Sequence, residues 1–123
     1  MPDYQNRKTI LCIDDDDGML NYHRALLERR GFEVLTATSP RKGLQIAVAF
    51  KVAAVIVDYN MPEMNGHELA TEIKRMRPQI PVVMVSSDGE IPEHVLKGVD
   101  AFVSKDEAHF RLCSVISRIC AGR

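Results

Sequence analysis

Five short apolar runs, separated by longer segments of helical spacing, constrain the fold of this chain more than any other feature of its sequence. Each run is too short for a typical helix, and most are rich in Val and Ile, which favours β-strands. Because the runs are almost continuously apolar, we expect strands that are covered on both faces, as in a parallel sheet. The predicted strands are Thr9–Ile13, Phe32–Thr36, Ala53–Val57, Pro81–Val85 and Ala101–Val103.

The segments between these runs carry helix signals. Asp17–Arg30 has apolar residues at helical spacing and is ended by Gly31, and Asp16 or Asp17 is expected to cap it. The other helices are predicted to start at Ser39-Pro40, to run from Asn65-Gly66 to before Pro78, from near Ile91-Pro92 to Gly98, and from about Asp106 to Cys120. The residues expected on inner helix faces are Met19, Leu20, His23, Leu26, Leu27, Leu44, Ala47, Val48, Leu69, Ile73, Met76, Phe110, Cys113, Ile116 and Cys120, with His23 packed and hydrogen-bonded.

Strand and helix alternate five times within 123 residues, without a linker or repeat. This order predicts a single α/β domain over residues 1–123, with a doubly wound, five-stranded parallel sheet and five helices. The formal net charge of -1, with acids and bases mixed along the chain, argues against a direct nucleic-acid surface. Because we find no signal peptide and no apolar stretch of about 18 residues, we expect a soluble cytoplasmic protein with no membrane contact.

Polar residues stand where four of the predicted strands end, the edge at which such sheets bind ligands. They are Asp14 and Asp15, Asp58, Ser86, and Lys105. Two carboxylates about 4 Å apart repel by roughly 4 kcal/mol at an effective dielectric of 20, so three that converge need a cation. Oxygen ligands beside an open pocket suit Mg²⁺. With a positive charge and a hydroxyl added, the set fits phosphoryl transfer to a carboxylate nucleophile.

In this order, the segments resemble the receiver domains of two-component response regulators, chemotaxis regulators among them. Ile10–Asp15 resembles the family's first strand with its acidic pair. Val55–Gly66 resembles the phosphoacceptor segment, in which the aspartate precedes a Met-Pro turn and a Gly-led helix. Pro81–Ser86 and Ala101–Lys105 resemble the fourth and fifth strands. The resemblance implies a flavodoxin-like sheet with strand order 2-1-3-4-5.

The resemblance also implies a phosphorylation site at Asp58 with bound Mg²⁺ or Mn²⁺. Asp15 is expected to bind the metal directly and Asp14 through water. The phosphoacceptor Asp58 and the backbone carbonyl of Asn60 are expected to complete the protein's metal ligands.

Further roles follow from the same resemblance. Ser86 and Lys105 are expected to bind the phosphoryl group, and Ser86 and Phe102 to form a switch pair. Asn60 and Asp88 are expected to position the water that hydrolyses the aspartyl phosphate.

The implied function is a phosphorylation-activated signalling switch. It would take the phosphoryl group from the phosphohistidine of a sensor histidine kinase or phosphotransfer protein. After changing conformation, it would signal to a downstream protein partner or a fused output domain. It would assist its own phosphoryl transfer and dephosphorylation without being an enzyme for an external substrate.

Two departures from the family pattern leave questions open. Asp106 follows Lys105 where the family usually has proline, and a non-proline cis bond costs about 2.5–4 kcal/mol. The turn is therefore trans or strained, and the direction of Lys105 stays open. The stretch from Ser86 to Lys105 is also nearly one helical turn shorter than usual, which trims the fourth helix.

Two alternative functions remain. The first is a receiver-shaped interaction module that is never phosphorylated. The second is a haloacid dehalogenase-like phosphatase, because Asp15–Leu20 resembles that family's nucleophile loop. However, Met19 stands where those phosphatases have Thr or Val, and the Asp58 segment would have no explanation.

Overall fold

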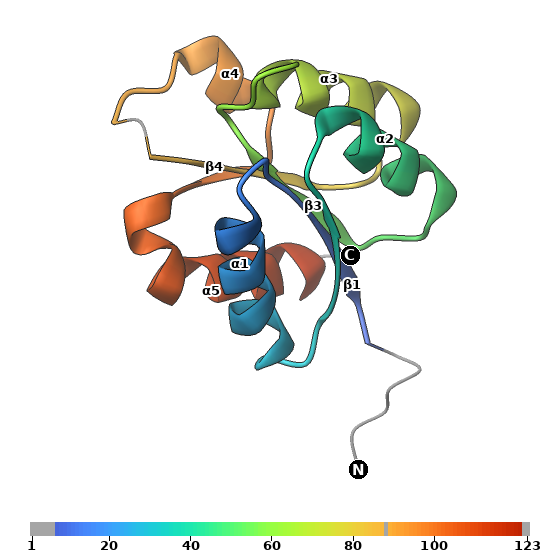
Figure 1. The fold of residues 1–123 in the computed structure, drawn as a ribbon, viewed down its shortest axis with the longest axis vertical. Coiled ribbons are helices and arrows are strands. Elements are labelled where there is room, and N and C mark those ends of the chain that lie inside the picture. The colour runs from blue at the N-terminus through green and yellow to red at the C-terminus, as the bar shows by residue number, and fades with distance from the viewer. Residues whose placement is uncertain (1–6, 88, 122–123) are drawn as a thin grey trace.

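The computed structural model describes residues 7–87 and 89–121. Strands and helices alternate along the chain, as predicted (Figure 1). The strands are β1 (Thr9–Ile13), β2 (Glu33–Ala37), β3 (Ala54–Asp58), β4 (Val82–Ser86) and β5 (Ala101–Ser104). The helices are α1 (Asp17–Glu28), α2 (Pro40–Ala49), α3 (Gly66–Met76), α4 (Glu93–Lys97) and α5 (Ala108–Ala121), with a 3₁₀ turn at Lys105–Glu107 before the last.

The five strands form one parallel sheet in the order β2-β1-β3-β4-β5. β1 and β3 are neighbours in the sheet although α1, β2 and α2 separate them in the sequence. The strand order therefore reverses between β1 and β3, which is where sheets of this kind bind ligands. The predicted doubly wound sheet with five helices is confirmed.

Alternate residues of the strands pack against opposite layers of helices. On one face, Ile10 and Cys12 of β1 pack with buried residues of α1 and α5. On the other face, Leu11 and Ile13 pack with buried residues of α2 and α3. Figure 1 shows these two pairs of helices on opposite sides of the sheet. Because both faces are covered, polar groups are left to the edges where the strands begin and end.

Side-chain caps begin three helices where the sequence predicts them. Asp16 caps α1, Ser39 caps α2 and Asn65 caps α3, each by accepting hydrogen bonds from backbone N–H groups of the first turn. The turn after α1 contains Gly31 at φ +91°, a conformation that favours glycine. No helix within the described ranges is long and apolar enough to span a membrane.

Three side chains that were predicted on inner helix faces are exposed instead. They are Val48 (42%), Met76 (42%) and Phe110 (60%). In α2, small residues face the sheet, and a Cβ at Gly43 would lie 2.7 Å from Cγ1 of Ile13. Ala47 is buried on the same face, so Val48, about 100° further round the helix, turns outward. The prediction failed because it used helical spacing without knowing which residues pack closest.

Gly66 begins α3 directly against the end of β3. Its N–H donates to the carbonyl of Tyr59 at 2.7 Å, and a Cβ here would lie 2.7 Å from Tyr59 Cα and closer still to the carbonyl oxygen of Asp58. These neighbours are backbone atoms, which cannot turn aside as a side chain can. We therefore expect Gly66→Ala to lower the free energy of unfolding by about 1–3 kcal/mol in urea denaturation.

Gly89→Ala is the matched control, because a Cβ at Gly89 meets nothing within 4 Å. It should leave the denaturation midpoint almost unchanged. Equal midpoints for the two variants would contradict the close approach of α3 to the end of β3.

Candidate functional site

The carboxyl ends of four strands bring predicted site residues to one edge of the sheet. Asp14 follows β1 and lies beside Asp58, the last residue of β3, because β1 and β3 pair in parallel. Ser86 ends β4 and pairs with the last residue of β5, directly before Lys105. Strand register therefore sets the arrangement of these side chains.

Three carboxylates converge at this edge. One oxygen from each of Asp14, Asp15 and Asp58 lies within 4.8 Å of the others. Asp14 and Asp58 are only 1% and 3% exposed, whereas Asp15 is exposed. Asp14 accepts a hydrogen bond from the backbone N–H of Asp16 at 2.9 Å, and Asp58 accepts one from that of Asn60 at 3.4 Å. Two of the carboxylates are thus buried and held by the backbone, while the third faces solvent.

Lys105 supplies a positive charge between the two buried carboxylates. Its Nζ lies 3.3 Å from Oδ2 of Asp14 and 3.2 Å from Oδ1 of Asp58. The described residues contain no cis peptide bond, so the bond from Lys105 to Asp106 is trans. A 3₁₀ turn starts at Lys105, and from there the ammonium group still reaches both carboxylates. The family's proline is therefore not needed for this contact.

The charges at this edge do not balance. Burial, with the negative charge of Asp14, raises the pKa of Asp58 from 3.8 to about 6, although Lys105 and the backbone N–H of Asn60 act in the opposite direction. Burial lowers the pKa of Lys105, but the charges of Asp58 and Asp14 outweigh it and raise the pKa above 10.5. Lys105 therefore stays protonated at neutral pH, while burial and the charge of Asp14 both oppose the ionisation of Asp58.

The donor set fits a hard divalent cation. When ionised, the three carboxylates face one ammonium group, which leaves two negative charges. Oδ2 of Asp14 is buried, and the ion pair with Lys105 at 3.3 Å is its contact within the described residues. A few oxygen ligands beside solvent suit Mg²⁺, or Mn²⁺ in its place. Asp14, Asp15 and Asp58 are therefore the residues that could hold such an ion.

The remaining predicted residues lie at different depths around this cluster. Ser86 is fully buried at the end of β4, and Phe102 of β5 is partly buried. Asn60 is exposed just beyond β3. Asp88 lies outside the described residues.

His23 is a neighbour of the cluster that the sequence did not connect with it. It is 1% exposed on α1, yet its Nε2 has no hydrogen-bond partner within the described part of the chain, contrary to expectation. Burial lowers the pKa of His23. The negative charge of Asp14 acts to raise this pKa, and the positive charge of Lys105 acts to lower it. The inward stripe of α1 predicted the burial of His23, but its nearness to these charges depends on where α1 crosses the sheet.

The raised pKa of Asp58 makes stability depend on pH in a defined direction. Between about pH 4 and pH 6 the folded chain keeps a proton that the unfolded chain has released, so the free energy of unfolding falls as pH rises and levels off above pH 6. The rise in the pKa of Asp58 from 3.8 in the unfolded chain to about 6 in the folded chain corresponds to a free energy of about 3 kcal/mol. We expect Asp58→Asn, measured in EDTA, to gain about 1–3 kcal/mol of stability at pH 7.5 and far less at pH 4.

Asp106→Asn is the control for this measurement, because Asp106 is an exposed carboxylate near the same edge. Its effect on stability should be small at both pH values. A gain for Asp58→Asn that is equal at pH 7.5 and pH 4 would exclude charge repulsion as its cause.

Known proteins are similar to this chain in sequence. Residues 10–117 match the family model described as response regulator receiver domain. Over 99 residues the chain is 37% identical to the transcriptional regulatory protein GlrR of Escherichia coli (strain K12), covering 78% of this chain and 22% of that protein. It is 29% identical over 99 residues to the transcriptional regulatory protein SrrA of Staphylococcus aureus (strain NCTC 8325 / PS 47), covering 78% and 41%. The chain thus spans less than half the length of these two relatives.

Solved structures agree on the fold. A CheY-like response regulator receiver domain protein from Methanospirillum hungatei JF-1 matches with a TM-score of 0.88 at 27% identity, over 95% of this chain and 96% of that chain. The response regulator TrrA from Thermotoga maritima, in complex with Mg²⁺-BeF, matches in fold with a TM-score of 0.86 at 22% identity, over 91% and 98%. From its sequence, its sheet and the match over residues 10–117, the chain belongs to the family of response regulator receiver domains.

Proposed function

We propose that this chain is a phosphorylation-activated switch in which Asp58 accepts a phosphoryl group. The observation that carries the proposal is the setting of Asp58, a buried carboxylate at the end of a central strand. Its Oδ1 lies 3.2 Å from Nζ of Lys105, and two further carboxylates lie within 4.8 Å. Membership of the receiver family supports the same function, because receiver domains are signalling switches rather than classical enzymes.

The proposed donor is the phosphohistidine of a sensor histidine kinase or of a phosphotransfer protein. A carboxylate oxygen of Asp58 attacks phosphorus while the bond from phosphorus to the imidazole nitrogen breaks, and the nitrogen keeps the electron pair. The products are an aspartyl phosphate and a donor histidine that has lost its phosphoryl group. With a pKa of about 6, Asp58 is mostly ionised at neutral pH and can act as the nucleophile.

Lys105 and Ser86 are the residues that we assign to the transferred group. The ammonium group of Lys105 already contacts Asp58, so it can neutralise charge on a phosphoryl oxygen there. Ser86 ends the neighbouring strand β4, from which its hydroxyl can donate to another oxygen. Both contributions are positioning and charge neutralisation, which dominate phosphoryl transfer.

Mg²⁺ is the cofactor in this proposal, held by Asp14, Asp15, Asp58 and the backbone carbonyl of Asn60, with Mn²⁺ able to replace it. When bound, it would neutralise the charge that develops on the phosphoryl oxygens. The chain's own part is to hold the ligands in place. The backbone N–H of Asp16 fixes Oδ1 of Asp14, and Oδ2, which forms the 3.3 Å ion pair with Lys105, would be the oxygen turned to the metal.

Ser86 and Phe102 form the switch pair that carries the change to the surface. They lie on the neighbouring strands β4 and β5. When Ser86 turns toward the phosphoryl group, the ring of Phe102 moves inward behind it. Phe102 has no hydroxyl, so burial of its partly exposed ring has to favour this state. Amide exchange should then change at residues 101–104 on phosphorylation.

The output of the switch is a downstream protein partner or a fused output domain. GlrR and SrrA are named transcriptional regulatory proteins, and the chain matches only 22% and 41% of their lengths. Regulation of transcription through such a partner or domain is therefore part of the proposal.

Incubation with acetyl phosphate and Mg²⁺ tests the proposed function. We expect intact-mass spectrometry to show a single phosphate adduct, which Asp58→Asn and excess EDTA each abolish. Asp106→Asn, an exposed carboxylate change near the same edge, should keep the adduct. An adduct of equal yield in Asp58→Asn would refute the acceptor, and no adduct under any condition would favour the non-phosphorylated interaction module.

The phosphorylated state should last only seconds to minutes, because Asn60 and Asp88 are proposed to hold the hydrolytic water in line with phosphorus. If so, Asp88→Ala slows decay at least about tenfold, or about 1.4 kcal/mol of barrier. Decay is followed by intact mass after the donor is removed. Glu90→Ala removes an exposed carboxylate two residues along the chain and should leave the rate unchanged. Equal decay rates in wild type and Asp88→Ala would exclude this role.

A further inference from the structure

A concave site lies at the edge of the sheet opposite the carboxylate cluster, where the strands begin. It is a cavity of about 660 Å³ between the starts of β1, β3 and β4 and the ends of α3 and α5. This volume is within the range of small-molecule sites in proteins. None of the residues assigned to the phosphoacceptor site lines this cavity.

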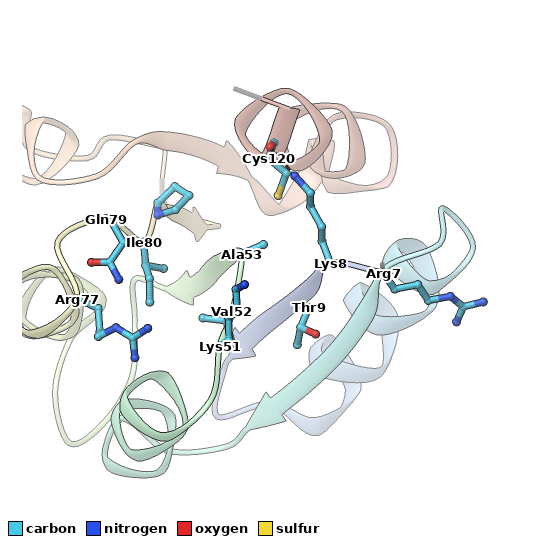
Figure 2. A pocket seen from close by; sticks show the side chains of 11 residues that line it. Arg7, Lys8, Thr9, Lys51, Val52, Ala53, Arg77, Gln79, Ile80 and Cys120 are labelled. Atoms are coloured by element: carbon cyan, nitrogen blue, oxygen red, sulfur yellow. Dashed lines mark hydrogen bonds between the residues drawn. The ribbon is translucent and has the colours of Figure 1, made fainter. Parts of the chain in front are cut away.

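The cavity has an apolar floor and a basic rim. Val52 and Ile80 are 6% and 3% exposed on the floor. Lys8, Lys51 and Arg77 belong to the rim, and none of the eleven described lining residues is acidic. Figure 2 shows Lys8 reaching toward the end of α5 on one side and Arg77 on the other, with Val52 between them. The lining of the cavity therefore combines an apolar surface with positive charges and no negative ones among the described residues.

Two of these cations are held in place by helix ends. Nζ of Lys8 donates to the carbonyl oxygen of Cys120 at 2.8 Å, and Nη1 of Arg77 donates to those of Ala47 and Val48 at 3.3 and 3.2 Å. An ammonium group has three N–H donors and a guanidinium group has five, so both keep donors for a ligand. Their side chains are thus already oriented, which lowers the entropy that binding would cost.

Positive charge prevails among the residues that line the cavity. The ends of α2, α3 and α5 meet here, and each helix end carries about half a negative charge. Three full positive charges from Lys8, Lys51 and Arg77 exceed that sum. Lys51 is exposed and makes no ion pair or hydrogen bond with its side chain within the described ranges. Arg7 also lines the cavity, but its side chain points away from the cavity in Figure 2, so its charge is not counted among the proposed contacts.

We propose that this cavity binds a small organic phosphate of nucleotide size. The phosphate oxygens would contact Lys8, Lys51 and Arg77, and an apolar ring would lie against Val52 and Ile80. The fork of a guanidinium group matches phosphate oxygens in pairs, and several cations suit a ligand with several negative charges. A nucleoside polyphosphate has both the charge and the flat ring. This inference is independent of phosphorylation at Asp58, because the two sites lie at opposite edges of the sheet.

Titration of the full chain with ATP, followed by amide NMR shifts, tests the proposal. EDTA is present and Mg²⁺ absent, so that ATP cannot be drawn to the carboxylate cluster through a metal. We expect saturable shifts at residues 8–9, 51–53, 77 and 79–80 with a Kd below about 1 mM. Affinity should fall as salt is raised. Adenosine and inorganic triphosphate, which each lack one half of the ligand, should bind more weakly than ATP.

Lys51→Glu should weaken ATP binding at least about tenfold, because it reverses the charge of one proposed contact. Lys42→Glu makes the same charge change at the other end of α2 and should leave the affinity unchanged. Lys51 is an exposed side chain, and a dispersed amide spectrum confirms that the variant is folded. Equal losses in the two variants, shifts centred on Asp58 and Lys105, or no saturation by 10 mM ATP, about ten times the expected Kd, would each overturn the proposal.

The acetyl phosphate adduct separates this proposal from the proposed function. Lys51→Glu should still gain one phosphate at Asp58, and Asp58→Asn should still bind ATP. Loss of one property without the other shows which of the two proposals has failed.

Discussion

Repulsion between Asp14 and Asp58 is the interaction on which the arrangement of the site depends. These carboxylates are buried at the ends of neighbouring strands, and parallel pairing of β1 with β3 prevents them from moving apart. Lys105 neutralises part of the charge, yet burial, together with the charge of Asp14, still raises the pKa of Asp58. The folded chain thus keeps an excess of negative charge where it can be offset by a metal ion or a proton. The repulsion at this edge lowers the stability of the folded chain, and a bound cation would restore part of it.

The covered sheet carries its own charged groups at its two edges, and the helix ends match the sign of each edge. Apolar side chains fill both faces, so charged groups gather where strands begin and end. The helices run opposite to the strands, and the starts of α1 and α3 lie at the edge with the carboxylates. Helix starts favour negative charge and helix ends favour positive charge. The acidic cluster and the basic cavity therefore follow from the same topology.

Most of the fold could be predicted from the sequence, because strand and helix periods are local properties. The strand ends also predicted which carboxylates meet, since Asp14 and Asp58 each follow a buried apolar run. Contacts between distant segments could not be predicted. The basic cavity depends on a hydrogen bond between Lys8 and Cys120, which are 112 residues apart in the sequence. The orientation of Lys105 and the environment of His23 likewise depend on how helices and turns pack against the sheet.

The contact of Gly66 with the backbone of Asp58 restricts how Asp58 can move. Because α3 begins against the carbonyl oxygen of Asp58 with no side chain between them, there is no compressible layer on that side. A bulky group added to Asp58 cannot be accommodated by a local shift toward α3. Asn60, two residues along the chain, is exposed, so we expect strain from an added group to be relieved there and not toward α3. Any movement that an added group causes at Asp58 is therefore expected to run away from α3.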